Sequence, residues 1–172
     1  MTHPLYAVSV PPLTHGLLNL SAILSKAQAH AAAQGYDAEL LLQQRLIVDM
    51  FPLSRQIQIA ADFVRGVPAR LAGVEVLSIA DNQSNLAEMQ ALIQTSVDFA
   101  RGIDPALFDS AASRIITLRP GTPKERRFHG QDYLIHYGLP NFYFHLTTAY
   151  AILRSQGVPI GKPDFLGALP TL

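Results

Sequence analysis

LIHYGLPNFYFHLTTAY, residues 134–150, has the spacing of an amphipathic helix. At about 100° per residue, Asn141 falls within about 60° of His145 on the helical wheel. The other residues on that face are mostly apolar: Leu134, Gly138, Thr148, Ala149 and Ile152. Burying a polar group without a partner costs about 2–7 kcal/mol, so Asn141 and His145 should be hydrogen-bonded or should bind a ligand. This polar pair is the first candidate site.

The same spacing predicts three further long helices before this one. The first begins near Pro12 and ends at Gly35, and the second begins at Pro52 and fades between residues 66 and 73. The third follows Ser84 as its cap and ends at Gly102, and the last helix extends over residues 130–156. Shorter helical segments are expected at 38–45 and 105–109, with the caps Asp37 and Asp104.

Two extended segments, 113–119 and 124–128, flank Pro120-Gly121-Thr122-Pro123 and predict a small hairpin before the last long helix. The tail, residues 160–172, is punctuated by proline and glycine and should pack as a loop. We therefore expect a single all-α domain over residues 1–172: an antiparallel four-helix bundle with a β-hairpin insertion before its last long helix.

Composition limits the possible partners. The chain of 172 residues has no cysteine, which excludes disulfides and thiolate chemistry. Its 13 basic and 13 acidic residues cancel, so no global field favours nucleic acid or an anionic membrane. Residues 1–6, MTHPLY, lack the basic segment and long apolar run that are typical of a signal peptide, and no run of 18 apolar residues occurs in the sequence. We expect a cytoplasmic protein with a small neutral or apolar ligand, binding neither nucleic acid nor membrane.

Two arguments place this ligand in the bundle core. Pro140 frees the carbonyl of His136 and should bend the last helix, which opens room between helices. On the second helix, Gln56 lies beside Leu53 and Ile57, so its amide should point inward. Gln56, Asn141 and His145 are therefore expected to converge near the bundle axis, where ligand and metal sites of bundles are built. The alternative is that these groups only satisfy one another in the core.

Three other residues are weaker candidates. His15 lies one turn from Asn19 on the first helix and could line the same cavity as a ligand-binding residue, or it is a boundary residue of an amphipathic helix. His136 stands about 180° from His145 on a straight helix and should face elsewhere unless the bend rotates it inward. Asp49 is either a carboxylate ligand or the N-cap of the Pro52 helix, and capping is the favoured role.

Surface patterns bear on assembly. Phe142, Tyr143, Phe144 and Tyr150 surround the last helix, so some of them should pack against a second subunit or elsewhere in the core. We expect a homodimer. The charge run Lys124–Arg127 resembles a nucleic-acid contact, but the absence of net positive charge favours a solvated hairpin.

Three segments resemble a known family: DMFPLSRQIQ (49–58), LPNFYFHLTTAYAILR (139–154) and GKPDFLG (161–167). They are similar to the bacterial domain-of-unknown-function family 1993, within the DinB/YfiT-like superfamily of proposed metalloenzymes. That resemblance implies a four-helix bundle in which a helix-2 histidine and a His-x-x-x-His pair on the last helix bind a divalent metal. By this register His145 matches the second histidine of the pair, Asn141 takes the place of the first, and Gln56 or a neighbour takes the place of the helix-2 histidine.

Two hypotheses follow from the resemblance and the residues together. In the first, His145, Asn141 and Gln56 hold zinc or nickel, and the protein is a metal-dependent hydrolase or thiol-dependent transferase. Two amides and one imidazole form a weak ligand set for such ions, however. In the second, favoured hypothesis, the site is degenerate and holds no metal cofactor. The protein then binds a small ligand or serves as a dimeric scaffold.

Overall fold

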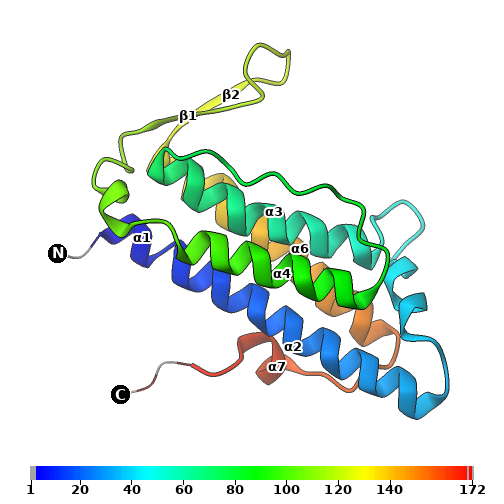
Figure 1. The fold of residues 1–172 in the computed structure, drawn as a ribbon. Coiled ribbons are helices and arrows are strands. Elements are labelled where there is room, and N and C mark those ends of the chain that lie inside the picture. The colour runs from blue at the N-terminus through cyan, green and yellow to red at the C-terminus, as the bar shows by residue number, and fades with distance from the viewer. Residues whose placement is uncertain (1–2, 170, 172) are drawn as a thin grey trace.

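Four long helices form the bundle of this computed structural model, which describes residues 3–169 and 171. They are α2 (Val10–Gln34), α3 (Leu53–Ala72), α4 (Leu86–Arg101) and α6 (Leu139–Ser155). Helix α3 packs against both α4 and α6, and α2 packs against the same two helices from the other side. Figure 1 shows the resulting bundle. The predicted four-helix architecture is confirmed.

Shorter elements connect and cover these helices. They are α1 (Pro4–Ala7), η1 (Ala38–Gln43), η2 (Pro105–Phe108), β1 (Ile115–Leu118), β2 (Arg126–His129), α5 (Gly130–Tyr133), η3 (Leu134–Gly138) and α7 (Lys162–Leu166). Strands β1 and β2 pair antiparallel, with Ile116 opposite Phe128. The predicted hairpin is thus confirmed, and it lies at one end of the bundle just before the last helical stretch (Figure 1).

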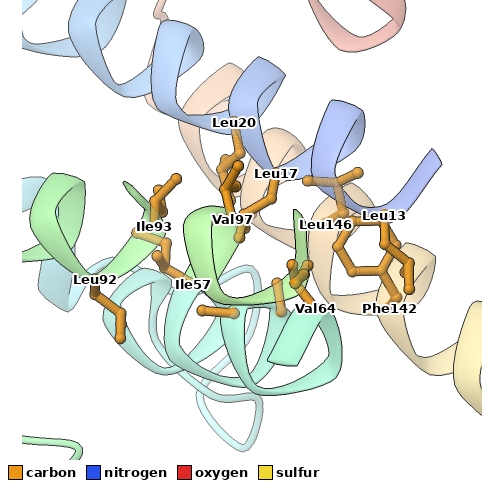
Figure 2. Packing of buried hydrophobic residues seen from close by; sticks show 14 of the residues in the cluster. Leu13, Leu17, Leu20, Ile57, Val64, Leu92, Ile93, Val97, Phe142 and Leu146 are labelled. Atoms are coloured by element: carbon orange, nitrogen blue, oxygen red, sulfur yellow. The ribbon is translucent and has the colours of Figure 1, made fainter. Parts of the chain in front are cut away.

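Apolar side chains from all four long helices meet in one core. Figure 2 shows Leu13, Leu17 and Leu20 of α2 facing residues of the other three helices: Ile57, Val64, Leu92, Ile93, Val97, Phe142 and Leu146. By length and composition, one helical stretch of the described residues, Pro4–Gln34, could cross a membrane. Half of its most apolar window is buried within the bundle, as in a core helix. The expected cytoplasmic location stays a prediction.

The helix termini agree with the sequence-based predictions at some positions and differ from them at others. Gly35 ends α2 in the left-handed region, and the Asp37 side chain accepts a bond from the Glu39 amide. The expected cap Asp49 is wrong: it lies in a turn before Pro52, and the Leu53 amide donates to the Gln44 carbonyl instead. The cap of α4 is not Ser84, because Asn85 accepts from the Glu88 amide while the Glu88 carboxylate bonds back to the Ser84 amide.

Helix α3 does not fade at Gly66 but continues to Ala72, through Pro68. Residues 64–69 are all buried, so packing outweighs the low helix propensity of glycine and proline. The tail is not only a loop, because residues 162–166 form α7, which packs on α2. Pro140 is the second residue of α6, so it lies at a helix start rather than inside a continuous helix. The five residues before α6 form the wide π turn η3, and the bend expected at Pro140 stays a prediction.

Candidate functional site

A cleft of about 650 Å³ lies beside α3 and the connection between α3 and α4. Helix α3, that connection, the hairpin and the α5–α6 stretch all contribute to its walls. The lining residues are Arg55, Ile59, Asp62, Phe63, Arg65, Arg70, Val76, Leu77, Ser78, Ile79, Asp81, Leu118, Arg119, Tyr133, Tyr137, Asn141 and His145. Its size is in the range of sites for small organic molecules.

Gln56 and His145 meet at one end of this cleft. Gln56 is 1% exposed, as its inward position predicts, and its Oε1 lies 2.7 Å from Nδ1 of His145. The amide nitrogen of Gln56 donates to the Phe51 carbonyl at 3.2 Å. A carbonyl can only accept, so this bond orients the amide with its oxygen toward the imidazole. The predicted meeting of α3 and α6 at these two side chains is confirmed.

This orientation determines which ring nitrogen of His145 carries the hydrogen. Because Gln56 Oε1 can only accept, Nδ1 must carry the hydrogen, and the neutral ring keeps its lone pair on Nε2. Burial lowers the pKa of His145, and the nearby positive charge of Arg55 lowers it further. Nε2 makes no hydrogen bond within the described part of the chain. His145 is therefore a neutral hydrogen-bond acceptor in the wall of the cleft.

Asn141 lines the same cleft one helical turn earlier, but it does not bond to His145 or Gln56. Its Nδ2 donates to the Tyr137 carbonyl at 2.7 Å, which leaves Oδ1 as a second acceptor. Both Asn141 and His145 are half-buried rather than central to the apolar stripe. The stripe is centred on Phe142 and Leu146 because these larger apolar side chains fill the core. The helical wheel therefore placed Asn141 and His145 wrongly at the centre of the apolar stripe, because the centre is one residue further along the helix, at Phe142 and Leu146.

The other candidates lie elsewhere. Nε2 of His15 is 2.6 Å from the Leu166 carbonyl, on the side of α2 covered by α7, and His15 does not line the cleft. His136 is exposed, as its wheel position predicts. Of the aromatic set around α6, Phe142 is buried and Tyr150 packs edge-on against Phe165 of the same chain.

The charged wall of the cleft comes from α3 and the α3–α4 connection. Arg65 is 2% exposed and holds the connection through the Leu77 carbonyl at 3.1 Å, while also bonding Ser96 Oγ at 2.6 Å and the Asp62 carboxylate. Arg55 pairs with Asp81 of the connection. Sequence analysis missed this wall. The one sign of this wall in the sequence was Arg65, a charged residue directly after Val64 on the apolar face of the helix.

Comparison with known proteins agrees with this architecture. The model of a family described as a domain of unknown function, DUF1993, matches residues 5–166. The chain belongs to this family. A crystal structure of a DinB family member from Shewanella denitrificans is similar with a TM-score of 0.92 and 38% sequence identity, over 98% of this chain and 94% of that chain. The resemblance to DinB proteins is confirmed. A search of curated proteins found no match.

The metal implied for a DinB-like bundle does not fit the residues of this chain. A metal on the free Nε2 of His145 would lie on the opposite side of the ring from Gln56, whose oxygen already accepts from Nδ1. That leaves one imidazole and one amide oxygen, a poor set for zinc or nickel. Among the described residues, no three His, Asp or Glu side chains form a metal-binding group. In this DUF1993 protein Gln56 orients His145 and is not a ligand beside it.

Proposed function

We propose that this protein binds a small organic molecule in the cleft beside α3. The observation that supports the proposal is the pair of acceptors, His145 Nε2 and Asn141 Oδ1, that internal hydrogen bonds leave available in a 650 Å³ cleft. A small number of polar groups that converge in a pocket of this size is typical of ligand-binding sites. A ligand with a hydroxyl or N–H group would donate to these two acceptors.

Blocking the cleft tests this proposal. Ser78 is exposed at the lining of the cleft, so Ser78→Trp should fill the opening without disturbing the core. The matched control is Ser113→Trp, an exposed serine that does not line the cleft. Saturation-transfer NMR with a fragment library should find binders of the wild type and the control that Ser78→Trp loses. An absence of binders, or equal binding to both variants, would contradict the proposal.

The alternative is a divalent-metal-dependent hydrolase or a thiol-dependent transferase that uses His145. A neutral imidazole with an oriented Nδ1–H favours it, because catalytic and metal-binding histidines are held in this way. The donor set opposes it. Elemental analysis of protein purified without chelator separates the two functions, since the alternative requires about one metal ion per chain, lost in His145→Ala.

A further inference from the structure

The cationic side chains of the cleft outnumber its carboxylates. Four arginines and two aspartates line it. Both aspartates already have partners on the cleft wall, Asp81 with Arg55 and Asp62 with Arg65. Within the described residues, Arg70 and Arg119 form no ion pair. These two arginines therefore bring to the cleft positive charge that no ion pair of the described residues neutralises.

Arg70 is held in place by a close approach to its own helix. A Cβ on Gly66 would overlap Nη1 of Arg70, so the guanidinium folds back along α3 into space that only glycine leaves open. Nη1 also lies 3.4 Å from the Tyr133 hydroxyl, a long hydrogen bond. A guanidinium has five N–H donors, and the others of Arg70 have no acceptor among the described residues. A planar fork of this kind matches a carboxylate or phosphate.

Arg119 approaches from the hairpin in an unusual backbone conformation. Its φ is +51°, the one positive φ of a non-glycine residue in the described chain. Its carbonyl accepts bonds from the Thr122 amide and hydroxyl, which closes the turn after β1. Non-glycine residues in this region are strained and tend to be kept at functional positions. A glycine would relieve the strain, but it would remove the charge from the cleft.

Aromatic rings connect the two ends of the cleft. Phe63 stacks on His145 at 6.3 Å between centroids, Tyr137 lies 5.9 Å from Phe63, and Tyr133 stacks on Tyr137 at 5.7 Å. The row begins at the acceptor His145 and ends at Tyr133, the neighbour of Arg70. A flat ring laid against this wall would gain stacking contacts and exclude water from the charged end.

We propose that Arg70 and Arg119 bind the carboxylate or phosphate of a ligand whose flat ring lies against Tyr137. This inference rests on the proposed function, because it assumes that the cleft holds a small molecule. It adds the chemical class of that molecule: an anionic group at the arginine end, an aromatic or other flat body, and a hydrogen-bond donor facing His145.

Binding of matched probes tests the charge requirement. The probes are benzoate and 2-naphthoate, phenyl phosphate and 2-naphthyl phosphate, and the neutral benzamide and 2-naphthamide, measured by ligand-observed NMR at low salt. We expect at least one anion of a ring series to bind at least about tenfold more tightly than the amide, as loss of a charge-assisted hydrogen bond implies. Comparing carboxylates with phosphates identifies which oxyanion the site prefers.

Three variants and one control assign the effect to these residues. Arg70→Gln should weaken the preferred anion about tenfold, whereas Arg101→Gln, an exposed arginine at the end of α4 outside the cleft, should leave its affinity unchanged. Gly66→Ala keeps every charge but displaces the Arg70 guanidinium, so it should also weaken the anion. Arg119→Gly should weaken the anion without lowering the melting temperature, which a structural role for this side chain would lower.

The outcomes separate this inference from the proposed function. Neutral amides that bind as tightly as the anions, in a manner that Ser78→Trp abolishes, would overturn the anionic site and leave the ligand cleft standing. Anion binding that Arg70→Gln and Arg101→Gln reduce equally would overturn it as well. If no probe binds the wild type, the inference fails, and the fragment library then decides whether the proposed function fails with it.

Discussion

Replacing Gln56 with leucine should destabilise the protein and change the tautomer of His145. The side chain is buried and makes two bonds, to His145 Nδ1–H and to the Phe51 carbonyl. Leaving a buried polar group without its partner costs about 1–3 kcal/mol, and there are two such groups. Because His145 is half-buried, water can replace part of its bond, and leucine adds apolar burial worth about 1 kcal/mol. We expect a net loss of about 1.5 kcal/mol.

Urea denaturation would measure this loss, and for a chain of this length it corresponds to a fall in melting temperature of about 3–6 °C. The control is Gln58→Leu on the same helix. Gln58 is 6% exposed and bonds only the side chains of Gln83 and Arg55, so its replacement should cost less than about 1 kcal/mol.

Nitrogen-15 NMR of the imidazole supplies the second measurement. The wild type should show hydrogen on Nδ1 and a lone pair on Nε2, and Gln56→Leu should shift the population toward hydrogen on Nε2. Equal destabilisation by the two leucine variants, or a wild-type ring already protonated at Nε2, would refute the orientation of His145 by Gln56.

Four further predictions concern other properties. Since the pKa of His145 lies below its usual value, the unfolded chain takes up its proton first as the pH falls; the free energy of unfolding should decrease below pH about 6.5, and His145→Phe should reduce that slope in urea titrations. Mass spectrometric metal analysis after incubation with zinc or nickel should find far less than one ion per chain. One ion per chain would contradict the conclusion that these residues do not fit a metal. Arg65→Met should cost about 2 kcal/mol, because the Leu77 carbonyl and Ser96 Oγ lose their buried donor while Asp62 is exposed enough for water to replace its partner. It should also speed hydrogen exchange in residues 74–84, and unchanged exchange would show that other contacts hold the connection. We propose a homodimer through Phe144, which is 57% exposed, and sedimentation equilibrium should give twice the chain mass for the wild type and a single chain for Phe144→Glu; a monomeric wild type would refute it.

The bundle was predictable because its evidence is local and repeated. Apolar residues three and four apart mark each long helix, and Gly35 and Asp37 mark where one ends and the next begins. The meeting of Gln56 with His145 was also predictable, because the wheel placed Gln56 correctly on the inner face of α3 and placed His145 close to, although not at, its position at the edge of the apolar stripe of α6. The helix caps were less predictable. Asp49 and Ser84 lie close to helix starts, but the Leu53 amide of α3 donates to the Gln44 carbonyl, and Asn85 rather than Ser84 caps α4.

The charged wall was not predictable for a different reason. The connection between α3 and α4 has no periodicity, so nothing in the sequence shows that it folds along α3 and covers Arg65. Arg70 looks like an ordinary arginine in the last turn of a helix. Its orientation depends on Gly66 one turn earlier and on Tyr133, which lies 63 residues away in the chain.

The wide turn η3 has a consequence for how the α5–α6 stretch presents its side chains. Tyr133, Tyr137, Asn141 and His145 are spaced by four, and all line the cleft. In a regular helix of 100° per residue, the twelve positions from Tyr133 to His145 would rotate the first side chain about 120° away from the last. A π turn accommodates one extra residue, which reduces that rotation to about 20°. The π geometry of η3 thus aligns two tyrosines with the polar pair. If the same residues formed a regular α-helical turn instead, Tyr133 and the hairpin before it would turn away from His145 by about 100°, roughly a quarter of a revolution.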